Sequence, residues 1–283
     1  TTKEACGNAV RNVTACPLAG VCNDESFDVT PYSAALAHFL LGHPDCQDFG
    51  RKFKVTFSGC QEHACGLTNM HDFGALAVIR EVNGIKKRGF MIYVGGGLGA
   101  VPHPAKLFDE FIEEEELLPI AQAIGRVFAR LGEKRNRARA RIKFLIAKLG
   151  IEEFKRLVLE ERKILPFDER WTSYINELPS YGEKAKKDPS KFTMEIDDLK
   201  FNEWYRSNIY PQTQDGYSVV TISLPLGDIS SHQVRKLADI TREYIRDSIR
   251  LTVEQNIVLR WVSNEDLYFL YQDLKKINLD TPG

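Results

Sequence analysis

The stretch at residues 50–65, GRKFKVTFSGCQEHAC, decides the fold because a strand pattern runs directly into a pair of thiols. Residues 51–58 alternate with a period of two, which predicts a β-strand. One face would carry Arg51, Phe53, Val55 and Phe57, and the other Lys52, Lys54, Thr56 and Ser58. Two ammonium groups on one face repel each other, which favours an anion between them. The alternative is the solvated face of an edge strand, where lysine is common.

The composition is that of an ordinary globular chain, and its 283 residues are enough for two domains. Hydrophobic residues make up 43% and charged residues 27%, with a formal net charge of −1. This balance gives no global basic field for nucleic acid, so any binding of anions must be local.

Neither a membrane span nor a secretory signal is predicted. No apolar run approaches the roughly 18 residues that a transmembrane helix needs. The first residues, TTKEACGNAV, lack an initiator Met and a basic-then-apolar pattern. We therefore expect a cytoplasmic protein, and the chain could be an internal fragment.

The cysteines are clustered, which favours a metal or cofactor region over a disulfide framework. All six lie in the first quarter of the chain: Cys6, Cys16, Cys22, Cys46, Cys60 and Cys65. Two loop pairs, Cys16 with Cys22 and Cys60 with Cys65, could supply four thiolates to an iron–sulfur cluster or to zinc. Their spacing is wide for a zinc ribbon. The alternative is that they are buried free thiols that pack as small hydrophobic groups.

In the first half, turn and capping signals predict one helix and one hairpin. A helix should start near Thr30 as its N-cap with Pro31 at the first helical position, bury Leu36, Phe39 and Leu40, and end at Gly42. Strands at residues 75–82 and 90–94 should form a hairpin around Asn83 and Gly84. We expect helices from there to residue 165, with the basic residues 135–143 on more than one face of a helix, and a polar linker at residues 166–204.

The last segment predicts a strand, a helix, two strands and a helix. The strands are expected at residues 217–223, 249–253 and 257–262. Ser230 and Gln233 form a capping-box pair before the apolar positions Val234, Leu237, Ala238, Thr241 and Ile245. A final helix should follow Ser263 and Asp266. This order is that of a ferredoxin-like α+β half domain.

The glycine loop at residues 95–99 formally matches a dinucleotide fingerprint, Gly95-x-Gly97-x-x-Ala100. However, Pro102 and Pro104 break the helix that a Rossmann loop must open, and the preceding strand belongs to a hairpin. The glycines still allow close approach of a flat or anionic ligand. A plain tight turn, and a nucleotide-dependent enzyme, remain the alternatives. His63, His71 and His103 lie near these loops and are each expected to be structural.

Six ordered motifs resemble the sirohaem-dependent nitrite and sulfite reductase family. They are Arg11-Asn12-Val13, Pro17-Leu18-Ala19-Gly20, Gly50-Arg51-Lys52-Phe53-Lys54, His71-Asp72-Phe73-Gly74, Val94-Gly95-Gly96-Gly97-Leu98-Gly99 and Asn136-Arg137-x-x-x-Arg141-x-Lys143. By this resemblance residues 1–165 are the first of two sirohaem and 4Fe-4S domains, and residues 205–283 the second of two ferredoxin-like repeats. The implied fold class is α+β, a mixed sheet-and-helix domain followed by a ferredoxin-like half domain.

The resemblance implies a six-electron reduction of nitrite to ammonia or of sulfite to sulfide. The cofactors would be sirohaem and a [4Fe-4S] cluster, and the electron donor a ferredoxin or a flavoprotein. It places Arg11, Lys52 and Lys54 in a ring of cations around the substrate. Candidates for binding the sirohaem carboxylates are Arg51, Gly95, Gly96, Gly97, Gly99, Arg137, Arg141 and Lys143.

The sequence departs from the family pattern in two ways. The family's cluster cysteines belong to its second sirohaem domain, so Cys16, Cys22, Cys60 and Cys65 would be relics of a duplication. Glu254 stands in the strand position where the first ferredoxin-like repeat supplies a substrate arginine. We therefore expect a chain that is catalytically incomplete alone, and the alternative is a non-catalytic iron–sulfur binding or electron-transfer module.

Overall fold

The computed structural model describes residues 8–63 and 65–283 and divides into two compact units. The first unit contains the described residues up to Gly20 and Asp24–Tyr181. The second contains Val21–Asn23 and Gly182–Gly283. Each unit has its own hydrophobic core.

The first unit is built on a mixed five-stranded sheet in the order β1-β2-β3-β4-β5. The strands are β1 (Val10–Ala15), β2 (Phe53–Ser58), β3 (Phe73–Val82), β4 (Ile85–Val94) and β5 (Lys106–Glu113). β1, β2 and β3 are parallel, whereas β4 runs antiparallel to β3 and to β5. The strand at residues 53–58 is thus an inner strand, and its interpretation as a solvated edge is wrong.

The alternation predicted for β2 is confirmed. Phe53, Val55 and Phe57 are buried in the core. Thr56 and Ser58, on the other face, are buried as well, because the following loop folds over them. Thr56 Oγ1 donates to the Gly66 carbonyl at 2.6 Å, and the Gly66 N–H donates to Ser58 Oγ at 2.8 Å. Only the lysine end of this face remains open.

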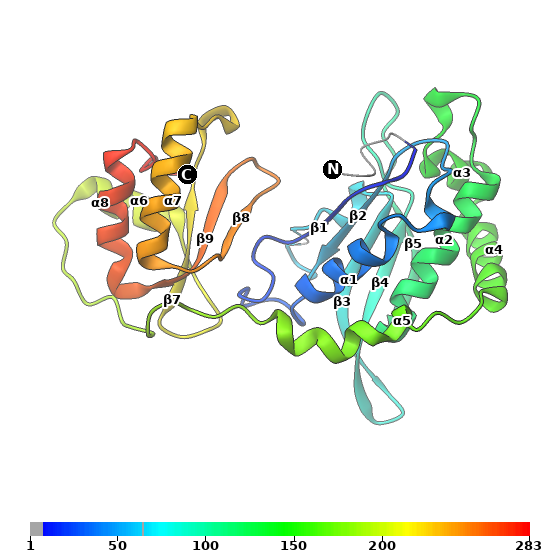
Figure 1. The fold of residues 1–283 in the computed structure, drawn as a ribbon, viewed down its shortest axis with the longest axis horizontal. Helices are drawn as coiled ribbons and strands as arrows, with labels where there is room; N and C mark the ends of the chain where they lie inside the picture. The colour runs from blue at the N-terminus through cyan, green and yellow to red at the C-terminus, as the bar shows by residue number, and fades with distance from the viewer. Residues whose placement is uncertain (1–7, 64) are drawn as a thin grey trace. The chain divides into compact units, whose positions relative to one another are not determined.

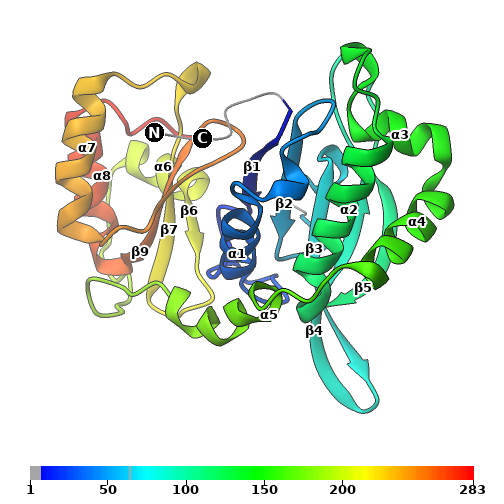
Figure 2. The ribbon, with the colours of Figure 1, turned by 45° about the vertical axis from the view of Figure 1, so that its right-hand side comes forward.

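Helices pack over the sheet (Figure 1; Figure 2). In both views α1 (Thr30–Leu40) and α2 (Leu117–Leu131) lie in front of the strands. α1 begins within one residue of the predicted start, because its N-cap is Val29 rather than Thr30. It buries Leu36, Phe39 and Leu40 as predicted. The remaining helices of this unit are α3 (Ile142–Leu149), α4 (Ile151–Ile164), α5 (Arg170–Ser173) and the 3-10 turns η1 (Pro44–Cys46), η2 (Thr68–Met70), η3 (Glu114–Glu116), η4 (Arg137–Arg139) and η5 (Tyr174–Tyr181).

The predicted hairpin is confirmed, and it is longer than expected. Val82 pairs with Ile85 across a two-residue turn in which Asn83 and Gly84 have φ angles of 54° and 79°. Both central residues therefore have positive φ, as in a type I′ turn. The closed end of the hairpin projects beyond the helices (Figure 1).

Two predictions for residues 100–143 are wrong. Residues 106–113 form β5 rather than a helix, because Phe108 and Ile112 are buried against the sheet and Phe90 pairs with Ile112. The basic run is not one helix either. Residues 135–141 form a loop around η4, whose N-cap is Asn136, and α3 begins only at Ile142.

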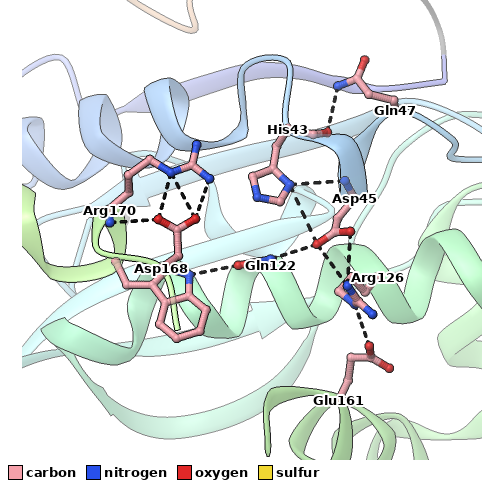
Figure 3. Close-up of polar contacts among 9 residues, drawn as sticks. His43, Asp45, Gln47, Gln122, Arg126, Glu161, Asp168 and Arg170 are labelled. Carbon is pink, nitrogen blue, oxygen red and sulfur yellow. Dashed lines mark hydrogen bonds and ion pairs between the residues drawn. The ribbon is translucent and has the colours of Figure 1, made fainter. Parts of the chain in front are cut away.

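A polar network explains why residues 168–181 belong to the first unit (Figure 3). The Asp45 carboxylate accepts from Gln122 Nε2 at 2.8 Å and from Arg126 Nη1 at 3.3 Å. Gln122 Oε1 accepts from Trp171 Nε1 at 2.9 Å, and Arg126 Nε donates to Glu161 at 2.6 Å. The network joins η1, α2, α4 and α5. The stretch predicted as a linker is therefore structured at its beginning, where Trp171 and Tyr174 enter the core.

The second unit has a four-stranded antiparallel sheet in the order β6-β7-β9-β8. Its elements are α6 (Leu199–Asn208), β6 (Ile209–Pro211), β7 (Tyr217–Ile222), η6 (Pro225–Gly227), α7 (Ser231–Tyr244), β8 (Ile249–Leu251), β9 (Ile257–Ser263), η7 (Asn264–Asp266) and α8 (Leu267–Lys276). Phe201 and Trp204 of α6 are buried in its core, so the predicted linker is also structured at its end.

The capping box at the start of α7 is confirmed, with the Ser230 side chain accepting from Gln233 N and the Gln233 side chain accepting from Ser230 N. Leu237, Thr241 and Ile245 are buried as predicted, but Val234 is 47% exposed. The strand predicted at residues 249–253 ends at Leu251. Glu254 therefore lies in the turn before β9 rather than in a strand.

Candidate functional site

The sheet topology brings most of the predicted site residues to one end of the strands of the first unit. The parallel strands β1, β2 and β3 all begin there, and β4 ends there because Val94 pairs with Phe73. Arg11 near the start of β1, Lys52 and Lys54 at the start of β2, and the glycine loop after β4 share this end. In the β1–β2 ladder Val10 pairs with Phe53 and Val13 with Val55, so Arg11 and Asn12 together lie opposite Lys54.

Four cations lie at this end of the strands: Arg11, Arg51, Lys52 and Lys54. We call this group of side chains the cationic edge. Arg11 is exposed and the other three are half-buried. Within residues 8–63 and 65–283, no carboxylate pairs with any of their side chains. Desolvation lowers the pKa of Lys52, and the positive charges of Lys54, Arg141, Arg11 and Arg51 lower it further. Such a cluster of mutually repelling, uncompensated cations favours the binding of an anion.

Asp72 is a buried hub beside this edge, and it was not predicted as a site residue. Its carboxylate accepts from the Lys54 backbone N–H at 2.9 Å and from Arg141 at 2.6 Å and 3.2 Å. Its side chain has no exposed surface. Burial raises the pKa of Asp72, while the Arg141 guanidinium opposes that rise. The sequence signal that could have found it is the motif His71-Asp72-Phe73-Gly74.

The glycine loop packs tightly against the η2 segment. Gly95 N donates to Asp72 O at 2.9 Å, and Gly96 N donates to His71 O at 2.8 Å. A Cβ on Gly96 would lie 2.6 Å from the Asn69 carbonyl oxygen, so only glycine fits there. A Cβ on Gly97 would meet the Arg141 guanidinium at 2.8 Å. The Gly97 backbone therefore lies against the Arg141 guanidinium, and a side chain at this position would displace that group.

Lys143 stabilises this loop by donating hydrogen bonds to its carbonyl groups. It is 4% exposed, and its Nζ donates to the carbonyls of Gly97, Leu98 and Val101 at 3.3, 3.1 and 2.6 Å. Its three ammonium protons are thus directed at the backbone. Desolvation lowers its pKa, as does the Arg141 charge. Arg137, in contrast, is exposed and lies near Asn8, with Nη1 3.4 Å from Oδ1.

The loop does not open a helix. Gly97 and His103 exchange backbone hydrogen bonds of 2.9 Å, and β5 follows. The arrangement lacks the strand-to-helix junction that places a pyrophosphate at a helix N-terminus, so the dinucleotide interpretation is wrong. His71 Nδ1 is 3.0 Å from Leu67 O, which agrees with a structural role.

Three of the predicted thiols gather at the opposite end of β1 and β2. Cys16, Cys60 and Cys65 lie in the first unit, whereas Cys22 belongs to the second. Hydrogen bonds from Cys16 and Cys60 lower the pKa of Cys65 to about 6 against the effect of burial, while the hydrogen bond to Cys65 raises the pKa of Cys16. In the described ranges, no group of three or more His, Cys, Asp or Glu side chains is arranged to hold a metal ion. Cys22 is thus assigned to a different compact unit from the other three thiols.

Family models match both units. Residues 6–165 match the model described as "Nitrite and sulphite reductase 4Fe-4S domain". Residues 210–277 match "Nitrite/Sulfite reductase ferredoxin-like half domain". No helix among the described residues is long and apolar enough to span a membrane.

Similar proteins are nitrite and sulfite reductases. The chain is 29% identical to the chloroplastic ferredoxin–nitrite reductase of Zea mays over 269 residues, covering 91% of the chain and 42% of that protein. It is 28% identical to sulfite reductase [ferredoxin] 2 of Mycolicibacterium paratuberculosis, covering 99% and 45%. The solved structure of the Mycobacterium tuberculosis NirA protein superposes with a TM-score of 0.75 at 26% identity, covering 99% and 46%. The chain thus spans less than half the length of these relatives.

Proposed function

Because the chain belongs to the nitrite and sulfite reductase family, we propose that it forms one half of an enzyme that reduces nitrite to ammonia or sulfite to sulfide. The observation that carries this proposal is the cationic edge, whose four cations have no carboxylate partner among the described residues. Both substrates are small oxyanions, and fixed cations favour their binding.

Arg11, Lys52 and Lys54 take the role of substrate-binding cations in this proposal. Their positive charge compensates the anion as it leaves water. The lowered pKa of Lys52 also makes its ammonium a better proton donor than an ordinary lysine. Protons are consumed when oxygen atoms leave the substrate as water, so Lys52 would deliver them to the departing oxygens.

The same edge suits an anionic, flat cofactor, which in this family is sirohaem. Arg51 is half-buried and Arg137 is exposed, and neither forms an ion pair among the described residues. Leu98 and Gly99 have N–H groups without a partner among the described residues. Sirohaem, coupled to a [4Fe-4S] cluster, would supply the electron transfer. Arg141 and Lys143 are already held by Asp72 and by loop carbonyls, so we assign them to shaping the loop.

We propose that the cluster ligands come from the part of the protein outside this chain, since no group of three or more His, Cys, Asp or Glu side chains in the described ranges is arranged to hold a metal ion. We propose a ferredoxin as the electron donor, since the relatives from Zea mays and Mycolicibacterium paratuberculosis are named as ferredoxin-dependent enzymes.

The test is the Lys52→Met variant in the full-length protein that contains this chain. The protein should show a sirohaem absorption spectrum and reduce nitrite or sulfite with reduced methyl viologen. Lys52→Met should leave the spectrum in place and raise the substrate KM about tenfold, the effect of losing a charge-assisted hydrogen bond of about 1.5 kcal/mol. Comparing nitrite with sulfite in both proteins identifies the preferred anion.

Lys163→Met is the matched control, because Lys163 is an exposed lysine of α4. It should change neither the spectrum nor KM. A full-length protein that takes up no sirohaem would refute the proposal and favour a non-catalytic module. Unchanged kinetics in Lys52→Met would remove that residue from the substrate site.

A further inference from the structure

The parallel strands β1 and β2 bring two thiols together at their carboxyl ends. Cys16 directly follows β1, and its N–H donates to Phe57 O of β2 at 3.0 Å. Cys60 follows β2 by one residue. Both are almost fully buried, at 2% and 1% exposure. Their proximity is thus fixed by the register of the sheet and not by a flexible loop.

A tight loop returns a third thiol to this place. The Gly66 N–H and carbonyl are both bound by side chains of β2, Ser58 and Thr56. A Cβ on Gly66 would lie 2.3 Å from Phe57 O, so the loop lies directly on the strand. Cys65, the preceding residue, therefore sits beside the two buried thiols. Cys65 packs against the buried core cluster to which Cys16 belongs.

The thiols differ in access to solvent. Cys65 is half-buried, whereas Cys16 and Cys60 are closed off. Among these three described thiols, Cys65 is therefore the one that a reagent from solution can reach. The surroundings of Cys65 also lower the pKa of its thiol to about 6, with the neighbouring Cys16 thiol as the largest cause. The thiolate is the nucleophile in disulfide exchange.

We propose that Cys16 and Cys65 form a reversible dithiol–disulfide pair that reacts with small disulfides in solution. It lies at the end of the sheet opposite to the cationic edge and does not depend on the proposed reductase activity. Cys65 is the attacking residue and Cys16 the resolving residue. Cys60 is the third thiol at this end of the sheet, and it is buried.

The exchange proceeds in two balanced steps. The Cys65 thiolate attacks one sulfur of a small disulfide such as oxidised glutathione, which breaks the reagent's S–S bond and releases one thiolate. The Cys16 thiol then loses its proton to the released thiolate and attacks the Cys65 sulfur, which forms the protein disulfide and releases the second thiolate. The protein gives up two electrons, and the small disulfide is reduced to two thiols.

The first test is made on the native full-length protein with iodoacetamide and peptide mass spectrometry. Cys65 should be alkylated at least tenfold faster than Cys46, a buried thiol of the same unit that serves as the control. After incubation with oxidised glutathione, a Cys16–Cys65 linkage should appear and should be reversed by dithiothreitol. Alkylation of Cys65 no faster than that of Cys46 would overturn the proposal.

Two variants separate the roles of the thiols. Cys16→Ala should accumulate a glutathione adduct on Cys65, because the resolving thiol is gone. Cys65→Ser should abolish both the adduct and the linkage, and Cys46→Ser should leave both as in the parent protein. A Cys60–Cys65 linkage in the parent protein, or linkages scattered over all cysteines, would refute the assignment of Cys16. The alkylation measurement needs no variant, so it remains decisive where a substitution prevents folding.

Discussion

Asp72 connects three segments of the first unit through one buried carboxylate. It bonds to the backbone of Lys54 on β2, follows the η2 segment and pairs with Arg141 just before α3. Because its partners include the Lys54 backbone N–H, the position of Lys54 at the cationic edge depends on Asp72. A buried acceptor with several donors is costly to remove, since each donor is left without a partner.

The Asp72→Asn variant should be destabilised by roughly 3 kcal/mol, because the Arg141 charge loses its counter-charge in a buried setting. Urea unfolding followed by circular dichroism measures the change. Asp48→Asn is the control, since the Asp48–Lys134 pair is exposed, with 82% of the Asp48 side chain accessible. Its effect should stay below about 1 kcal/mol. Equal losses of unfolding free energy in the two variants would show that the buried Asp72–Arg141 pair stabilises the protein no more than the exposed Asp48–Lys134 pair does.

The lowered pKa of Lys52 predicts a pH dependence of anion binding. The anion binds the protonated lysine, so affinity should fall as the pH rises through this lowered pKa, and the bound anion should raise the pKa again. The alkaline loss of affinity therefore begins at lower pH than for an ordinary lysine. Substrate KM measured across alkaline pH in the full-length protein reports it.

Lys54→Met removes the largest of the charges that depress the pKa of Lys52. It should move the alkaline loss of affinity to higher pH, while Lys52→Met should remove that step. A step that stays at the same pH in Lys54→Met would contradict the mutual repulsion of the two lysines.

The glycine loop is the element on which the site geometry depends most. Its position is set by hydrogen bonds to residues 71–72, by the bridge to His103 and by the Lys143 ammonium. All of these contacts are close approaches of backbone to backbone or to a cation. The element therefore tolerates side chains poorly, for reasons of space rather than of conformation at Gly96 and Gly97.

Gly96→Ala should destabilise the first unit by about 1–3 kcal/mol and lower the sirohaem content of the full-length protein, because the loop must move away from the Asn69 and His71 carbonyls. Gly84→Ala is the comparison. Its Cβ meets nothing within 4 Å, and only the positive φ of 79° is unfavourable, which costs about 1 kcal/mol. That variant should keep its sirohaem. Full sirohaem content in Gly96→Ala would show that the loop does not shape the cofactor site.

On the scale of the whole molecule, the chain consists of two units with separate cores. Each core is closed by its own helices: α4 contributes Phe154 to the first, and α6 contributes Phe201 to the second. Such an organisation predicts that the two units unfold as separate cooperative events.

Calorimetry of the 283-residue chain should show two transitions. Phe154→Ala should lower one and Phe201→Ala the other, each by the equivalent of about 3–5 kcal/mol, because both rings are at most 1% exposed. The two variants are matched in chemistry and control for each other. A single transition that both variants lower equally would contradict independent units.

Several features of this protein follow from the sequence because they depend on neighbouring residues. The alternation of β2, the start of α1 at Thr30, the turn at Asn83 and Gly84, and the capping box at Ser230 are local, and each is found within one residue of the place that the sequence predicts. The family followed from six ordered motifs, and the matches over residues 6–165 and 210–277 confirm it.

Only the tertiary structure decided which distant residues meet. β5 could not be distinguished from a helix, because its burial depends on pairing with β4, and the helices inside the predicted linker form because Trp171 and Phe201 each find a core. The role of Asp72 depends on Arg141, which lies 69 positions away in the chain. The cationic edge and the thiol cluster lie at opposite ends of the same parallel strands. The sequence shows that the residues of a strand alternate between two faces. Which residues lie beside each end of that strand depends on strand pairing and register, and these are defined only in the folded sheet.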